Sequence, residues 1–263
     1  QDIVVILVDE ASLNAMEGLV GRWPWPRSIF GDLINSLSEW GAKTIMFDVL
    51  YTEPSTPRDS EGSLGDDDLY LVEATAGSGI AIHSLHLFED SEDEHNKNLL
   101  NRPMPQDFIE QFAMKNVTSK GGEVSKHNKY YLPIRELYQN SSDIGVVEFS
   151  SDSDGVYRSS ELIREYQGNF FPTLPMAYLQ KEFSVKKTTM EIGGVRLDKI
   201  NIPLGHEGRY LINIKDNFTN FSIAGVLATI QKLNNGETDN LIVSPDDFKD
   251  KVIVDVGTGS GIL

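Results

Sequence analysis

The sequence contains no cysteine and comparatively few basic residues. Its 263 residues include 23 Lys and Arg against 40 Asp and Glu, so the formal net charge is −17. The absence of cysteine excludes disulfides, thiolate catalysis and cysteine-based zinc sites. A surface this acidic repels phosphate groups and anionic lipid head groups, so we do not expect nucleic acid as a partner.

The chain also lacks a long apolar run and a signal peptide. No stretch approaches the roughly 20 apolar residues needed to cross a bilayer. Residues 3–8 already have the composition of a buried strand, and so do residues 252–256. Because a domain seldom begins and ends inside its sheet, we expect this chain to be a piece of a longer protein.

The five histidines do not form a recognisable metal site. His83 and His86 are three residues apart on a predicted strand, so their side chains should point to opposite faces. The other histidines are scattered along the chain. The sequence therefore predicts neither a histidine-bound metal nor a cofactor.

The opening segment has the pattern of a strand, a helix and a second strand. Residues 3–8 form a short all-apolar run, as in a strand buried on both faces of a parallel sheet. A helix is predicted from about Pro26 to Gly41, with one apolar stripe made by Ile29, Phe30, Leu33, Ile34, Leu37 and Trp40. A second strand follows at residues 43–50. These lengths predict parallel strands that are neighbours in the sheet.

The remainder of the chain predicts further mixed α/β structure. Helices are expected around 69–76, 108–114, 170–183 and 221–233, and strands around 79–87, 143–149, 156–166 and 252–256. Short antiparallel strands are expected before residue 214. We therefore predict one α/β domain over residues 1–263, with a mainly parallel central sheet flanked by helices and an antiparallel β extension.

The segment Trp23-Pro24-Trp25-Pro26-Arg27 is the most distinctive in the chain. With IVVILVDEASL before it and GAKTIMFDVLYTEPS after the next helix, it resembles CHASE domains of the second type. Further similar segments follow in the same order: DSDGVYR, FFPTLPMAYL, RYLINI, NFTNFSIAGVL and FKDKVIVDVG. The resemblance spans nearly the whole chain and is weakest between about residues 90 and 130.

The resemblance implies an extracytoplasmic, periplasmic sensor domain of a bacterial inner-membrane signalling protein. Such domains regulate cytoplasmic outputs such as adenylate cyclases, diguanylate cyclases or kinases, and their stimuli are mostly unknown. The expected partners are a small-molecule or protein stimulus, the protein's own membrane helices and its output domain. Many of these cytoplasmic output domains act as pairs, so the resemblance is compatible with a homodimer. The domain itself is not expected to be an enzyme.

A polar site is predicted at the carboxyl edge of the sheet. Asp9 follows the first strand, Asp48 ends the second, and Arg27 begins the intervening helix, so all three should reach the edge where open α/β sheets bind ligands. They could form a ligand pocket, with Trp23 and Trp25 as its aromatic wall. The alternative is a structural cluster in which Arg27 neutralises both carboxylates and the tryptophans pack in the core.

A second group of candidate ligand-binding residues is Asp154 and Arg158 in the DSDGVYR segment. Residues 150–161 also have the oxygen, glycine and glutamate spacing of an EF-hand calcium loop. Serine stands at the first ligand position and the flanks look like strands, so a tight turn around Gly155 is the main alternative. The DSDG segment also resembles the signature of haloacid-dehalogenase phosphatases, in which an aspartate attacks phosphate. That signature needs a hydrophobic strand directly before the first aspartate, and Ser150 and Ser151 stand there instead.

The carboxyl-terminal segment VIVDVGTGSGIL is compatible with an enzyme instead of a sensor. It resembles the first motif of S-adenosylmethionine-dependent methyltransferases, with Asp255 and the following glycines near the cofactor. That fold needs further strands after the motif, whereas a sensor domain would end in a strand and a glycine turn. An acid-dependent hydrolase using Asp9, Asp48 or Asp154 and a purely structural envelope module are also compatible with the sequence.

Overall fold

The computed structural model describes residues 2–89, 102–147, 155–205, 208–213 and 218–256. The chain divides into two compact units. The first comprises Gln1–His83, Pro133–Ser142 and Asp216–Leu263, and the second comprises Ser84–Leu132 and Asp143–Lys215. Strand β3 begins in the first unit and ends in the second. Both helices and strands are present throughout, so the α/β prediction is confirmed.

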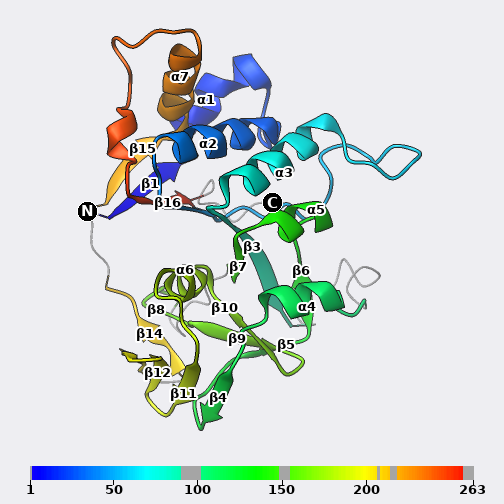
Figure 1. Cartoon of the computed structure of the whole chain (residues 1–263), viewed down its shortest axis with the longest axis vertical. Coiled ribbons are helices and arrows are strands. Elements are labelled where there is room, and N and C mark those ends of the chain that lie inside the picture. Colours follow the sequence, from blue (N-terminus) through cyan, green and yellow to red (C-terminus); the bar gives the residue numbers. More distant parts are fainter. Residues whose placement is uncertain (1, 90–101, 148–154, 206–207, 214–217, 257–263) are drawn as a thin grey trace. The chain divides into compact units, whose positions relative to one another are not determined.

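The first unit is a parallel sheet with helices packed on it. Its strands follow the order β15-β1-β16-β2-β3, and each adjacent pair is parallel. In Figure 1, α1, α2, α3 and α7 lie on the same face of this sheet. The elements are β1 (Ile3–Leu7), α1 (Glu10–Val20), α2 (Ser28–Glu39), β2 (Thr44–Phe47), α3 (Asp66–Ser78), β3 (Ala81–Phe88), α5 (Arg135–Asn140), β15 (Thr219–Ser222), α7 (Ile223–Asn234), a 3₁₀ turn (Pro245–Asp247) and β16 (Val252–Val256).

The last strand of the sequence lies in the middle of this sheet. β16 pairs with β1 on one side, with Ile3 opposite Val252, and with β2 on the other, with Thr44 opposite Val252. β1 and β2 are parallel, as expected, but the prediction that they are neighbours is wrong. The physical reason is that the apolar run of β16 suits a strand covered on both faces equally well, and no local pattern encodes the strand order.

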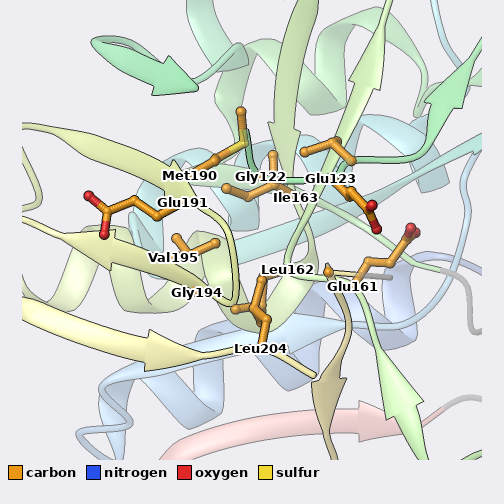
Figure 2. Close-up of a pocket in the computed structure, with 12 residues that line it drawn as sticks. Gly122, Glu123, Glu161, Leu162, Ile163, Met190, Glu191, Gly194, Val195 and Leu204 are labelled. Atoms are coloured by element: carbon orange, nitrogen blue, oxygen red, sulfur yellow. The ribbon is translucent and has the colours of Figure 1, made fainter. Parts of the chain in front are cut away.

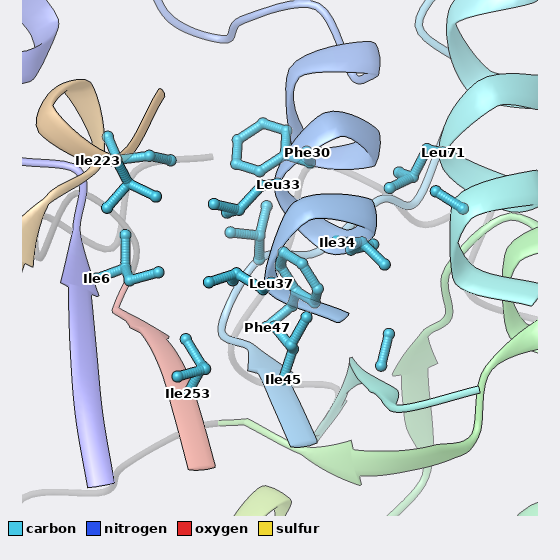
Figure 3. Close-up of a cluster of buried hydrophobic side chains, with 14 of the residues drawn as sticks. Ile6, Phe30, Leu33, Ile34, Leu37, Ile45, Phe47, Leu71, Ile223 and Ile253 are labelled. Carbon is cyan, nitrogen blue, oxygen red and sulfur yellow. The ribbon is translucent and has the colours of Figure 1, made fainter. Parts of the chain in front are cut away.

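The core of the first unit lies between α2 and the central strands. The predicted stripe is confirmed, because Phe30, Leu33, Ile34 and Leu37 are all at most 2% exposed. Figure 3 shows these side chains together with side chains from the sheet and from α3 and α7: Ile6, Ile45, Phe47, Leu71, Ile223 and Ile253. Burial of this stripe fixes which face of α2 contacts the sheet, and thereby fixes where its first turn lies.

Helix α1 was not predicted from the sequence. It begins after Asp9, whose side chain accepts a hydrogen bond from the backbone N–H of Ser12 at 2.8 Å. Only Ser12 and Met16 of this helix are buried, so its apolar periodicity is weak. The sequence signal for this helix is therefore the capping residue Asp9, and not a hydrophobic stripe.

The second unit is built from the end of β3 and several small sheets. β6 pairs antiparallel with β3, and the other sheets follow the orders β10-β9-β5, β13-β12-β11-β4 and β14-β8. The expected antiparallel strands are confirmed. The elements are α4 (Gln106–Phe112), β4 (Val117–Lys120), β5 (Lys126–His127), β6 (Lys129–Tyr131), β7 (Asp143–Val146), β8 (Ser159–Ser160), β9 (Ile163–Tyr166), β10 (Asn169–Pro172), α6 (Leu174–Glu182), β11 (Thr188–Glu191), β12 (Gly194–Leu197), β13 (Ile200–Pro203) and β14 (Tyr210–Leu211).

One predicted helix begins later than expected. The range 170–183 starts inside β10, which pairs antiparallel with β9, and α6 begins only at Leu174. Phe170 and Phe171 suit a half-buried strand, and Pro172 ends it before the helix begins.

Among the described residues, no helix has both the length and the apolar character required to cross a membrane.

Candidate functional site

The candidate site of the first unit is a pocket at the carboxyl end of β2. It has a volume of about 770 Å³. Its wall comes from the segment leading into α2, the segment following β2 and Asp67 of α3. The lining residues are Val20, Trp23, Pro24, Trp25, Pro26, Arg27, Phe30, Val49, Leu50, Tyr51, Thr52, Glu53, Pro54, Ser55, Thr56 and Asp67. Its place at the edge of a parallel sheet and its size are typical of small-molecule sites.

Arg27 is held at the pocket by a buried ion pair. Its Nη1 lies 2.5 Å from Oδ1 of Asp68, whose side chain is fully buried. Its Nη2 donates to the backbone carbonyl of Glu53, and its guanidinium lies over the ring of Tyr51, 5.1 Å from the ring centroid. The guanidinium therefore ties α2, α3 and the segment after β2 together. Removing either charge would leave the other one buried and unpaired.

Asp67 caps the first turn of α2 from the neighbouring helix α3. Its carboxylate oxygens accept hydrogen bonds from the backbone N–H groups of Arg27 at 2.6 Å and Ser28 at 2.7 Å. Partial burial raises the pKa of Asp67, but the hydrogen bonds from Ser28 and Arg27 outweigh burial and lower the pKa overall. Asp67 thus carries a negative charge at the N-terminus of α2, where the helix dipole favours one.

Four aromatic side chains line the pocket: Trp23, Trp25, Phe30 and Tyr51. Trp25 is 4% exposed and Phe30 is 2% exposed, whereas Trp23 is only partly buried. Trp23 meets Trp25 edge-to-face at 5.3 Å and Phe30 edge-to-face at 6.1 Å. The peptide bond between Trp23 and Pro24 is cis. Trp25 and Phe30 therefore belong to the core, and Trp23 presents its ring to the pocket.

A buried histidine supports the pocket from behind. The ring of His83 is stacked on Phe47 at 4.9 Å and meets Tyr51 edge-to-face at 5.9 Å. Its Nε2 lies 3.1 Å from Oγ1 of Thr75, and its Nδ1 has no hydrogen-bond partner in the described part of the structure. Burial lowers the pKa of His83 to about 3. The histidine is therefore neutral, and it acts as an aromatic packing residue.

The rim of the pocket is fixed by two further contacts. Both the backbone N–H and the hydroxyl of Ser55 donate to Oδ2 of Asp68, at 2.8 Å and 3.0 Å. Arg58 binds the carboxylate of Glu136 in α5 with both Nη atoms, at 2.8 Å and 3.0 Å. These contacts hold the long connection between β2 and α3 against the rest of the unit.

The structure brings three of the predicted residues together and separates two. Trp23, Trp25 and Arg27 line the pocket, whereas Asp9 and Asp48 do not. Asp9 caps α1 and accepts a hydrogen bond from the Ser222 hydroxyl at 2.9 Å. Its pKa is lowered mainly by the backbone hydrogen bond from Ser12. Within the described chain, no ion pair joins Arg27 to either aspartate, so the partner of Arg27 differs from the expected one.

Asp48 lies at the end of β2 without a described ion-pair partner. Its residue surface is exposed, yet the surrounding protein displaces enough water to raise the pKa of its carboxyl. The sequence analysis missed Asp67 and Asp68, which supply the acidic half of the site. Their only sequence signal was a run of three aspartates at the start of a helix, a pattern that also occurs on ordinary solvated helix ends.

The remaining predicted residues lie in the second unit or outside the described chain. Asp154 and the first part of the proposed calcium loop, residues 150–154, lie outside the described ranges. Arg158 is exposed, and its backbone carbonyl accepts a hydrogen bond from Ile212 at 2.8 Å. The glycines of the methyltransferase-like segment lie beyond residue 256 and are also outside. Among the described residues, no group of three or more acidic or histidine side chains could hold a metal.

A second cavity, in the second unit, is far smaller. Its volume of about 10 Å³ is at the lower limit for one water molecule. Figure 2 shows its lining of glycines and apolar side chains with Glu123, Glu161 and Glu191 among them. Glu161 is buried and pairs with Arg164 at 2.9 Å. This cavity is too small for an effector. Another pocket of the second unit, beside Asp143 and Lys181, has a volume of about 390 Å³. The pocket beside Trp23 has about twice that volume and contains three of the predicted residues, so we take it as the candidate site.

Comparison with known proteins gives one match. The family model described as the CHASE2 domain matches residues 1–260, which is essentially the whole chain. No curated protein and no solved structure matches the chain.

Proposed function

Because the chain belongs to the CHASE2 domain family, a family of sensor domains in signalling proteins, we propose that the pocket beside Trp23 is where this sensor receives its stimulus. The observation that carries the proposal is a pocket of about 770 Å³ at the carboxyl edge of a parallel sheet. Trp23, Trp25 and Arg27 of the most distinctive sequence segment all line it. A small molecule in this pocket would contact both α2 and the segment after β2.

In this proposal the chain acts as one extracytoplasmic sensor domain of a bacterial membrane protein. The family is extracytoplasmic, and the output would be a cytoplasmic cyclase or kinase elsewhere in the same protein. The ligand must favour one arrangement of the domain over another, since equal affinity for both shifts nothing. The proposal assigns no catalysis to this chain. Asp9 and Asp48 have no place in the pocket, which gives no support to a hydrolase.

The route for such a signal is short within the first unit. α2 begins at the pocket, directly after Arg27, and ends beside the entry to β16. There the backbone N–H of Asp250 donates to the carbonyl of Gly41 at 2.8 Å. The ring of Trp40 packs on Phe248 at 5.4 Å. β2 also pairs with β16 along its length. Movement of α2 or of the segment after β2 would therefore act directly on the last strand.

The test is to fill the pocket in the full-length protein. Thr52→Trp places a large side chain on an exposed lining position, away from the core. We expect this variant to lose the change in output that growth conditions produce in the wild type. The matched control is Thr238→Trp, which adds the same bulk to an exposed position of the same unit outside the pocket. A Thr52→Trp protein that responds as the wild type and the control do would contradict the proposal.

A further inference from the structure

We infer that the pocket selects an organic cation with an apolar body. The inference rests on the proposed role of this pocket and adds the chemical class of its ligand. It follows from three features of the lining. Its one cationic side chain is already neutralised, the carboxylate of Glu53 is not, and the indole ring of Trp23 is accessible.

The single arginine of the pocket is not available to an anion. Nη1 of Arg27 is paired with Asp68, and Nη2 donates to the carbonyl of Glu53. The guanidinium carbon lies over the Tyr51 ring. The Arg27 side chain is only 13% exposed. An anionic ligand would have to displace the fully buried carboxylate of Asp68, which would then lie unpaired in the core.

The uncompensated charge of the pocket is negative. The lining contains one arginine and two acidic residues, Glu53 and Asp67, and Asp68 behind the lining already balances the arginine. Asp67 is engaged by the backbone N–H groups of Arg27 and Ser28 at the positive end of α2, so the free negative charge of the lining is that of Glu53. Glu53 is exposed, and within the described chain no hydrogen bond or ion pair engages its carboxylate. A cation at the rim would gain from Glu53, whereas an anion would be repelled.

The accessible wall of the pocket suits an apolar cation. Trp23 is the partly exposed ring, and tryptophan offers the strongest cation–π face among the side chains. Val20 and Leu50 add aliphatic surface beside it. Hydroxyl groups of Thr52 and Thr56 stand at the rim. The lining can therefore bury an apolar body against indole and aliphatic groups while the charged group faces Glu53 and the Trp23 ring.

The experiment compares three probes of nearly the same shape and different charge. These are choline, its neutral isostere dimethylbutanol, in which carbon replaces the nitrogen, and the anion dimethylbutyrate. Binding to the chain is followed through the indole N–H signals in proton–nitrogen correlation spectra. The chain has three tryptophans. Trp23 and Trp25 line the pocket, and Trp40 lies outside it against Phe248.

We expect choline to shift the Trp23 signal more than the Trp40 signal, because Trp23 lines the pocket and Trp40 does not. Its affinity should exceed that of the neutral isostere about two- to five-fold, the factor that a partly exposed cation–π contact supplies. The anion should bind more weakly than both. Glu53→Gln should remove part of the preference for choline without weakening the neutral probe. Glu73→Gln, an exposed site on α3 outside the pocket, is the matched control.

The outcomes separate the ligand class from the role of the pocket. Equal or tighter binding of the neutral or anionic probe, or no shift of Trp23 with choline, overturns the inference of a cation. If Glu53→Gln leaves the preference for choline unchanged, Glu53 does not contribute to cation binding, and this result also counts against the inference. None of these results affects the response of the Thr52→Trp protein, which tests the role of the pocket without reference to ligand charge.

Discussion

Replacing His83 by phenylalanine should make the first unit less sensitive to acid. The imidazole is fully buried, stacked on Phe47 and in edge contact with Tyr51 of the pocket wall. Phenylalanine keeps the ring and its stacking but cannot be protonated. It also removes the buried Nδ1 that has no described partner, at the loss of the contact between Nε2 and Thr75.

The magnitude follows from the difference in proton binding between the folded and unfolded states. Burial lowers the pKa of His83 from 6.5 to about 3. Between these values the unfolded chain binds the proton and the folded chain does not, so stability falls as the pH falls through this window. Integrating that difference from about pH 7 to about pH 5 gives a loss of about 2 kcal/mol in the free energy of unfolding.

The assay is urea unfolding followed by tryptophan fluorescence at both pH values. All three tryptophans, Trp23, Trp25 and Trp40, belong to the first unit, so the signal reports the unit that contains His83. Other titrating groups contribute to both proteins, and the comparison between wild type and His83→Phe cancels their effect. The wild type should lose about 2 kcal/mol more than the variant between the two conditions. His86→Phe, on the same strand, is the control.

Equal acid sensitivity of the wild type and the His83→Phe protein would refute the reasoning. It would mean that burial does not keep His83 neutral, and therefore that water reaches the His83 ring beside Tyr51. A matching loss of acid sensitivity in His86→Phe would likewise show that the effect is not specific to the buried site.

Three further predictions concern packing and charge. Gly31→Ala should lower the free energy of unfolding in urea by about 1–3 kcal/mol, because its Cβ would lie 2.6 Å from the Tyr70 ring. Gly18 has open space around it, so Gly18→Ala should not lower the free energy of unfolding in the same assay. Asp67→Asn should cost about 1–2 kcal/mol in the same assay, since the cap of α2 loses its charge; no loss would contradict this role. Asp143→Asn should flatten the fall in stability with rising pH between 3.8 and about 6, because burial raises the Asp143 pKa to about 6; an unchanged pH profile would count against it.

Local sequence patterns predicted the elements of the first unit better than their arrangement. The stripe of α2 and the apolar runs of β1, β2 and β16 are short-range signals, and each was identified. The position of β16 between β1 and β2 depends on contacts between the two ends of the chain. Since all three runs are suited to a buried strand, their composition cannot specify which one is central.

The pocket lies at the edge of the sheet where the sequence placed the candidate site, but the partner of its arginine differs from the expected ones. Trp23, Trp25 and Arg27 precede a helix that starts at that edge, which topology alone makes predictable. Asp68 is separated from Arg27 by 41 positions in the sequence. Its burial results from the packing of α3 against α2 and the connection after β2. Because such a contact has no local signature, Asp9 and Asp48 were the expected partners instead.

Chemical labelling at the pocket mouth tests the central claim without knowledge of the ligand. The chain has no cysteine, so Thr52→Cys introduces its single thiol at an exposed lining position. The full-length protein would be treated in intact cells with a membrane-impermeant maleimide, and its output measured before and after labelling. We predict that labelled Thr52→Cys changes its output, whereas labelled Thr238→Cys does not. Complete labelling of Thr52→Cys with an unchanged output and an undiminished response to growth conditions would contradict the assignment of this pocket as the sensor site.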